Sequence, residues 1–178
     1  GKILDVFKYI DYQFFFRNNK KHFEKKIVFK AKGNEETTIP RIINNHNKVV
    51  LKIDIEGDEY KILNDIKRNS KRIFFLLIEF HNVHKNLIKI RNFIRKSDLK
   101  IIHIHANNYG GIDKNGNPKV IELSMLNSKK IKINRILSKR KYPIIDLDYK
   151  NFKRREDIKI EFNNFFCYSC ILIQPTRI

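Results

Sequence analysis

The stretch VVLKIDIEG, Val49–Gly57, decides the fold class of this chain. Its β-branched residues favour a strand, and Gly57 marks the end of that strand. Directly afterwards, Asp58 and Glu59 precede Ile62, Leu63 and Ile66, a spacing typical of a helix with acidic residues in its first turn. Residues 49–66 therefore predict a strand followed by a helix.

The pattern repeats toward the C-terminus. The run IFFLLIEFH, 73–81, is nearly continuous in apolar residues and predicts a strand buried on both faces. A helical spacing follows over 83–97, and a third strand is predicted over 99–105. Strand, helix, strand, helix and strand with short connections predict an α/β fold with a mostly parallel sheet. After a turn-rich loop, KVIELSML predicts one more strand, which is antiparallel because no helix fits before it.

The regions on either side are less regular. Residues 2–16 predict a helix with one apolar face, 27–30 a short strand, and Thr37, Thr38 and Pro40 the start of a further helix. Strand-like stretches recur near 158–162 and 165–173. We therefore divide the chain into an α/β domain over 1–150 and a strand-like tail over 151–178.

Composition narrows the class of protein. The chain has 178 residues, 42% of them hydrophobic, which is enough for a packed core, and 38 Lys and Arg against 19 Asp and Glu give a net charge of +19. Such a charge attracts polyanions, but Lys, Asn and Ile recur in every segment, which favours a general compositional bias. No apolar run is long enough for a membrane span, and no signal segment opens the chain. Cys167 and Cys170 fit buried strand residues better than a disulfide framework, so we expect a cytoplasmic protein.

Three pairs of polar residues lie two positions apart at strand ends, and each pair is expected to share one face of its strand: Asp54 with Glu56, Glu79 with His81, and His103 with His105. Ligands of open α/β sheets bind beyond the carboxyl ends of the strands, where the three pairs would converge. Strand ends also emerge into water, where a charged side chain costs little free energy, so the alternative interpretation is that these residues are simply solvated. If the pairs form a site, its carboxylates and imidazoles suit either a divalent cation or removal of a proton from a hydroxyl.

The block VVLKIDIEGDEYKIL, 49–63, resembles the LKIDIEGxE segment of the FkbM-type S-adenosylmethionine-dependent methyltransferases. The blocks IEFH, HIHANNYGGI and VIELS follow in the order found in one branch of that family, and IDLDY, 145–149, looks like its LDYP segment. The resemblance covers about residues 27–126. It implies a class I methyltransferase fold, which is Rossmann-like, with the strands of Asp54, Glu79, His103 and Ile121 as its fourth to seventh.

The resemblance also implies features that this sequence lacks. Class I methyltransferases hold the cofactor with a glycine-rich loop after the first strand, whereas this chain contains no G-x-G and no glycine cluster before Asp54. The first two strands are therefore expected to be missing. In the family's sheet these strands lie between the third and the fourth, so the short strand near Ile27 is expected to have no proper neighbour. The chain would then be the C-terminal portion of a longer protein or a degenerate copy without the cofactor site.

Two functions follow from these observations. The family implies O-methylation of a small molecule or a sugar with S-adenosylmethionine, and a divalent metal is an additional candidate cofactor. The rival hypothesis is a catalytically silent basic module that binds nucleic acid or an acidic partner. For the enzyme hypothesis, the candidate catalytic residues, which are also the candidate metal ligands, are Asp54, Glu79, His81 and His105. The candidate substrate-binding residues are Glu56, His103, Asn107 and Asn108.

Overall fold

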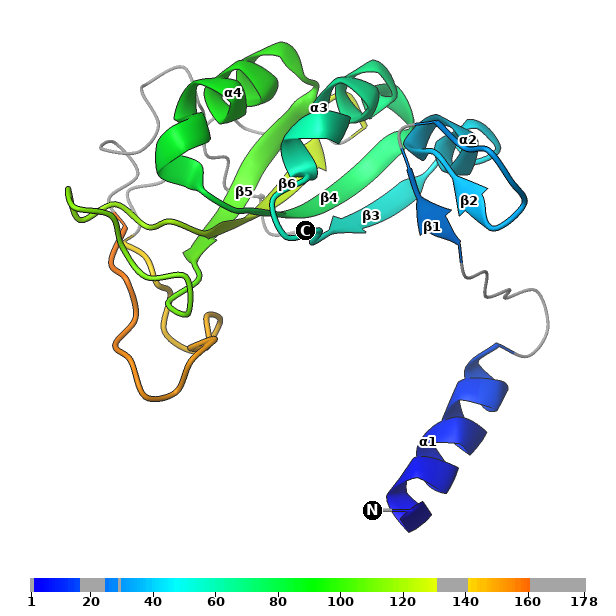
Figure 1. The fold of residues 1–178 in the computed structure, drawn as a ribbon, viewed down its shortest axis with the longest axis horizontal. Helices are drawn as coiled ribbons and strands as arrows, with labels where there is room; N and C mark the ends of the chain where they lie inside the picture. The colour runs from blue at the N-terminus through cyan, green and yellow to red at the C-terminus, as the bar shows by residue number, and fades with distance from the viewer. Residues whose placement is uncertain (1, 17–24, 29, 131–140, 161–178) are drawn as a thin grey trace. The chain divides into compact units, whose positions relative to one another are not determined.

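The computed structural model describes residues 2–16, 25–28, 30–130 and 141–160 (Figure 1). Contacts divide the chain into two units, with the boundary after Thr38, and each is described by itself. Cys167, Cys170 and the strand-like stretch over 165–173 lie outside the described residues, as does most of the basic stretch over 129–141.

The first unit contains the predicted N-terminal helix, α1 (Lys2–Phe15), and two short strands. These strands, β1 (Lys26–Ile27) and β2 (Glu36–Thr37), pair in parallel, with Lys26 opposite Glu36. The strand near Ile27 thus has β2 as a partner, which the sequence did not predict, and this two-stranded sheet is separate from the four-stranded sheet of the second unit. The turn at Gly33 brings the chain back, so that the backbone N–H of Lys26 donates to Glu35 O at 2.9 Å.

The second unit is built on a four-stranded sheet with the order β3-β4-β6-β5. The strands are β3 (Val49–Ile53), β4 (Ile73–Phe80), β5 (Leu99–Ala106) and β6 (Ile121–Asn127). β3 and β4 pair in parallel, and β6 is antiparallel to both β4 and β5. The fold is thus a mixed α/β fold, and the predicted antiparallel last pair is confirmed. β5 does not adjoin β4, because β6 lies between them.

Helices cover one face of this sheet. They are α2 (Ile39–Asn44), α3 (Glu59–Arg68) and α4 (Val83–Lys96), with a 3-10 turn at Ser70–Arg72. Figure 1 shows α3 and α4 on the same side of the sheet. Their buried residues recur every three or four positions, as in Ile62 and Ile66 of α3 and Ile90 and Ile94 of α4, and belong to one apolar core with the sheet.

The other face of the sheet is more polar than the sequence suggests. In β4, Leu76, Ile78 and Phe80 are fully buried, whereas Leu77 and Glu79 are only partly buried. β6 alternates in the same way, and among the described residues no helix covers this second face. The prediction that residues 73–81 form a strand buried on both faces is therefore wrong, because both crossover helices pack on the same side.

Residues 141–160, here called the strap, belong to the second unit and lie on the other side of the sheet from α3 and α4 in Figure 1. Tyr142 and Ile160 close the strap with a β-bridge, and both are buried. The buried side chain of Asn108 accepts from Phe152 N at 2.8 Å and donates to Phe152 O and Arg155 O. Part of the segment that the sequence assigned to a tail after residue 150 is thus bound to the sheet unit.

Candidate functional site

A pocket of about 300 Å³ opens on the second face of the sheet. Its polar walls come from all four strands and from the strap, and they are Lys52, Glu79, His103, His105, Glu122 and Asp148. Glu79 and His105 stand near the carboxyl ends of β4 and β5, and Glu122 lies opposite both of them because β6 runs the other way. The pocket therefore includes side chains from the carboxyl ends of β4 and β5, two of the strands whose polar pairs the sequence predicts to converge.

The end of β3 differs from the prediction. The strand stops at Ile53 rather than at Gly57, so Asp54 and Glu56 do not form a same-face strand pair. Glu56 adopts the left-handed conformation with φ 52°, and Gly57 has φ 108°. These two residues turn the chain sharply into α3, and the turn places the Glu56 side chain beside the residue that follows β4.

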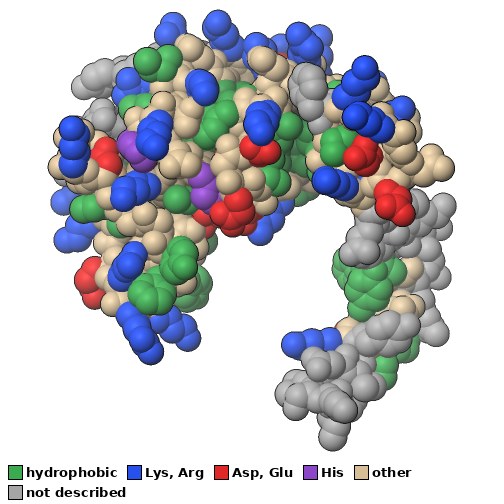
Figure 2. All heavy atoms as spheres, in the orientation of Figure 1, with side chains coloured by type: hydrophobic (Ala, Val, Ile, Leu, Met, Phe, Trp, Pro, Cys, Tyr) green, Lys and Arg blue, Asp and Glu red, His purple; other side chains and the backbone are tan. Residues whose placement is uncertain are grey.

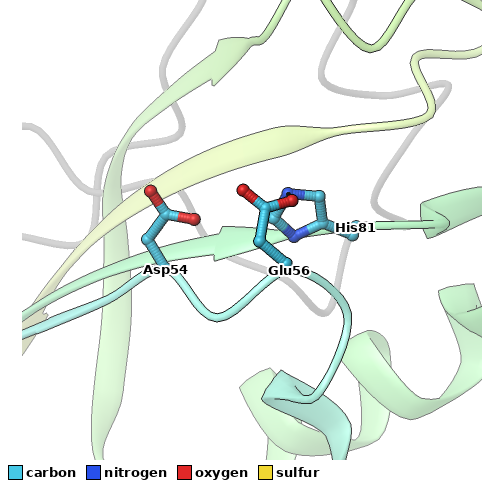
Figure 3. Close-up of side chains that lie close together, drawn as sticks. All are labelled: Asp54, Glu56 and His81. Carbon is cyan, nitrogen blue, oxygen red and sulfur yellow. Dashed lines mark ion pairs between the residues drawn. The ribbon is translucent and has the colours of Figure 1, made fainter.

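That residue is His81, and it forms what we call the rim cluster with Asp54, Glu56 and Glu59. Potential ligand atoms of Asp54, Glu56 and His81 all lie within 4.8 Å of one another, and Figure 3 shows both carboxyl groups directed toward the region of the His81 ring. Glu59 Oε1 lies 2.7 Å from His81 Nδ1 and also accepts from Gly57 N at 2.9 Å. Glu59 is fully buried and contacts Nδ1, so it holds the His81 ring on the side opposite to Glu56, which lies near Nε2.

Glu79 connects the rim cluster with the pocket. Its Oε1 lies 3.8 Å from His81 Nε2 and accepts a hydrogen bond from Asn107 Nδ2 at 2.8 Å. Burial raises the pKa of the Glu79 carboxyl, and the negative charges of Asp54 and Glu122 raise it further, whereas the Asn107 hydrogen bond acts in the opposite direction. Asn107 thus orients Glu79 rather than standing free in the pocket.

His103 is held by the strap. Its Nε2 lies 2.6 Å from Asp148 Oδ1, and Asp148 Oδ2 accepts from Ile144 N at 2.6 Å. The Asp148 side chain is only 4% exposed, so the pair is largely removed from water. His103 therefore lines the pocket with a ring that is already engaged on one nitrogen.

His105 lies deeper and faces two carboxylates. Its Nδ1 is 3.4 Å from Glu122 Oε2 and its Nε2 is 3.8 Å from Asp157 Oδ1. The hydrogen bond to Glu122 raises the pKa of His105 against the opposing effect of burial, and the same bond lowers the pKa of Glu122. Asn151 Nδ2 donates to the other oxygen of Glu122 at 2.9 Å. The pair is thus tied to the strap through Asn151 and Asp157.

The structure sorts the residues that the sequence singled out into three groups. Glu79, His103 and His105 line the pocket, whereas Asp54, Glu56 and His81 form the rim cluster beside it. Asn107 and Asn108 stand behind these groups, the first bonded to Glu79 and the second to the strap backbone.

Sequence reasoning missed Lys52, Glu122 and Asp148. The alternation in VIELS already places Glu122 on a polar face, and the antiparallel pairing with β5 sets it opposite His105. Asp148 lies in the IDLDY block that resembles the family's LDYP segment, but no spacing relates it to His103, because 45 residues separate the two.

The described residues do not fit the cofactor cradle that the family resemblance implies. Gly110 and Gly111 lie in the loop between β5 and β6, and Gly57 stands alone after β3. A tight turn that lets the backbone approach a dinucleotide-like ligand needs closely spaced glycines between a strand and the helix that follows it. Gly110 and Gly111 lead into strand β6 instead, and Gly57 has no second glycine beside it. We therefore assign no methyl-donor contacts to these residues.

A family model described as the methyltransferase FkbM domain matches residues 9–109, which is more than half of the chain. The chain belongs to this family. The match includes β3, β4 and β5 with the site residues from Asp54 to Asn108, and it ends before β6 and the strap. Neither the curated proteins nor the solved structures include a significant match to the chain. Among the described helices, none has both the length and the apolar character needed to cross a membrane.

Proposed function

We propose that this member of the FkbM methyltransferase family transfers a methyl group from S-adenosylmethionine to a hydroxyl group of a small molecule or a sugar. The observation that carries the proposal is the pocket that the matched domain forms together with β6 and the strap, with Glu79 and His105 on its wall near the carboxyl ends of β4 and β5. A volume of about 300 Å³ suits a small acceptor or a single sugar ring.

The topology supports a class I, Rossmann-like assignment of the fold. β3, β4 and β5 run in one direction, α3 and α4 connect them, and β6 runs in the opposite direction. We accordingly assign β3, β4, β5 and β6 to the fourth, fifth, sixth and seventh strands that the family resemblance implies.

Glu79 is the residue that we assign as general base. Methylation of a hydroxyl oxygen requires loss of its proton, and a carboxylate on the pocket wall accepts that proton when the acceptor lies within hydrogen-bond reach. Asn107 holds the Glu79 carboxyl in place, and Glu79 lies on the same face as His103 and His105. We assign the two histidines and Lys52 to contacts with the other polar groups of the acceptor.

S-adenosylmethionine is the donor that the family implies, and when bound it supplies the methyl group. Because the described residues lack a cradle for it, the proposal assigns donor binding to other residues of the protein. The described part supplies the acceptor pocket and the base.

The test uses the protein encoded by the complete gene. Calorimetry measures binding of S-adenosylmethionine, and a labelled methyl group reports transfer to a panel of sugars and small alcohols. We expect Glu79→Gln to lower transfer by at least 100-fold, the lower end of typical general-base effects, while donor binding is retained. Glu156→Gln is the matched control, because this side chain is 94% exposed and its partner among the described residues is Lys150. Absence of donor binding in the complete protein would reject the proposal.

The rival function, a silent basic module, makes a different prediction. A nucleic-acid-binding protein concentrates its cations on one surface. On the face seen in Figure 2, Lys and Arg side chains are spread over the sheet unit, with acidic side chains and histidines among them. Binding to DNA that weakens steeply with salt, in a protein that does not bind the methyl donor, would favour the rival function instead.

A further inference from the structure

We propose that Asp54, Glu56 and His81 bind a divalent transition-metal ion, with Glu59 as the residue that positions His81. This inference goes beyond the proposed methyl transfer and does not depend on it. The three side chains come from two strand ends, and Figure 3 shows their polar groups directed toward a common region. They combine two carboxylates with one imidazole.

The distances suit an ion after small side-chain movements. Nitrogen and oxygen ligands lie about 2.0–2.2 Å from a transition-metal ion, so two ligands of the same ion are at most about 4.4 Å apart. The potential ligand atoms already lie within 4.8 Å of one another. Both carboxylate side chains are exposed. A displacement of their carboxylate oxygens by less than about 1 Å, on the order of ordinary thermal motion, would bring the potential ligand atoms within reach of a single ion.

The imidazole of His81 is oriented for this role. Glu59 Oε1 lies 2.7 Å from Nδ1, and a carboxylate at that distance accepts a hydrogen bond from Nδ1–H. Nε2 then presents its lone pair on the opposite side of the ring, where Glu56 Oε2 lies 3.4 Å away. A carboxylate, a histidine and a metal in this order form the arrangement that fixes most metal-bound imidazoles in proteins.

Glu59 provides an independent indication of a missing positive charge. Its side chain is fully buried and aimed at the back of the rim cluster, and Oε2 has no hydrogen-bond partner in the described part of the chain. A buried carboxylate without a compensating charge is costly. A cation bound to His81 Nε2 would supply that charge through the imidazole.

The rim cluster has no Lys or Arg partner in the described part of the chain, a property that it shares with the pocket carboxylates Glu79, Glu122 and Asp148. Within the described residues, Asp54, Glu56 and Glu59 form no ion pair with Lys or Arg, although the chain contains 38 of these residues. Asp58, in the same turn, does pair with Lys61 at 2.7 Å. Lysines are therefore abundant and within reach of the turn, yet the rim cluster keeps its negative charge uncompensated.

The ligand types select the class of ion. Two carboxylate oxygens and one imidazole nitrogen suit borderline divalent ions such as Mn²⁺, Fe²⁺ or Zn²⁺, whereas Ca²⁺ prefers six or more oxygen ligands. Glu79 lies 3.8 Å from His81 Nε2 and also lines the pocket. An ion bound at the rim cluster would consequently lie beside the pocket wall.

The test measures Mn²⁺ binding to the full chain by electron paramagnetic resonance of the free ion. We expect one site, with Asp54→Asn and His81→Gln each weakening binding by more than 10-fold. In Glu59→Gln the amide oxygen can still accept a hydrogen bond from Nδ1–H, but the negative charge is removed. This variant should weaken Mn²⁺ binding about 10-fold, at the lower end of such positioning effects. Asp58→Asn is the matched control in the same turn and should change the affinity by less than 2-fold.

A second measurement locates the ion without relying on affinity. Bound Mn²⁺ broadens the proton resonances of nearby rings, so we expect the His81 ring signals to disappear at lower Mn²⁺ concentrations than those of His103 and His105. Circular dichroism of each variant checks that the chain is folded. Absence of saturable Mn²⁺ binding, affinities unchanged in Asp54→Asn and His81→Gln, or earlier broadening of His105 would each overturn the proposal.

Discussion

The same sheet edge carries two sets of histidines and carboxylates that differ in their access to solvent. In the rim cluster, His81 meets Glu56, whose side chain is 86% exposed. Under the strap, His103 meets Asp148, whose side chain is 4% exposed. Both contacts join a histidine to a carboxylate, so the difference is whether a later segment of the chain covers the carboxylate.

The comparison shows how a covering segment changes the role of a titratable pair. Asp148 pairs with His103 at 2.6 Å, whereas Asp157 Oδ1 lies 3.8 Å from His105 Nε2, too far for a hydrogen bond. The contact of Asp148 therefore attaches the strap more firmly than that of Asp157. Asp54 and Glu56 come from a turn next to their histidine, and the described part of the chain does not cover them. The covered set therefore contributes to stability, whereas the open set remains available for a ligand.

The largest effect is expected from releasing the strap. Asn108→Ala removes three hydrogen bonds to the strap backbone at a buried position, and it should lower the free energy of unfolding by about 3 kcal/mol. Urea unfolding measures the change. Asn64→Ala is the control, because its exposed amide oxygen accepts from Lys67 Nζ at 3.4 Å on the helix surface. A loss of the same size in this variant would contradict the role of Asn108.

A smaller effect is expected from the two histidine contacts themselves. Asp148→Ala leaves His103 and the N–H of Ile144 without their partner and should lower the free energy of unfolding by about 2 kcal/mol. Glu56→Gln should change it by less than about 0.5 kcal/mol, because that side chain is exposed. Equal losses in the two variants, measured by urea unfolding, would remove the distinction between the covered and the open set.

The His105–Glu122 pair should make part of this stability depend on pH. The pKa of His105 is raised above its ordinary value of 6.5, so its contribution is complete below that pH and is lost as pH rises through the raised pKa. The pKa of Glu122 is lowered from 4.5, so its contribution is present above 4.5 and is lost as pH falls through the lowered pKa. The pair therefore stabilises the fold most between about pH 4.5 and 6.5.

Nuclear magnetic resonance titration checks this prediction. We expect the His105 ring to titrate above 6.5 in the unaltered chain and closer to 6.5 or below in Glu122→Gln, because the hydrogen bond to Glu122 is the main cause of the shift. A His105 pKa that stays the same in this variant would assign the shift to another group.

The smallest effect is expected at the exposed pair beside the rim cluster. Lys61→Ala breaks the contact of Lys61 Nζ with Asp58 at 2.7 Å, but both side chains are more than half exposed. Such pairs contribute about 0.2–0.5 kcal/mol, and salt reduces this further. Thermal unfolding at low and high salt measures it, and a loss above 1 kcal/mol would mean that even exposed contacts at this rim support the fold.

Local patterns made most of the fold predictable. The strand at Val49, helix α3 and strand β4 follow from β-branched residues and helical spacing within about ten residues of each other. The face that β4 shows to solvent was not predictable, because it depends on both crossover helices packing on one side. The pairing of β1 with β2 also depends on a contact between separate segments.

The residues of the candidate site also divide into those that local sequence patterns predict and those that depend on contacts between distant segments. Asp54, Glu79, His81 and His105 are recognisable because strand ends gather at one edge of a sheet. The relation between Asp54 and Glu56 was mistaken, because a turn with a left-handed Glu56 replaces the last residues of the expected strand. Asp148 reaches His103 only through the tertiary path of the strap, which no spacing in the sequence encodes.

The end of the family match at Tyr109 separates the two walls of the pocket. One wall, with Glu79, His103 and His105, is encoded within the matched stretch, and the other, with Glu122 and Asp148, is encoded after it. Substitutions of Glu122 or Asp148 would change the second wall without altering a residue of the matched stretch. Because β6 lies between β4 and β5, only its pocket-facing side chains can vary in this way while its buried residues hold the sheet together.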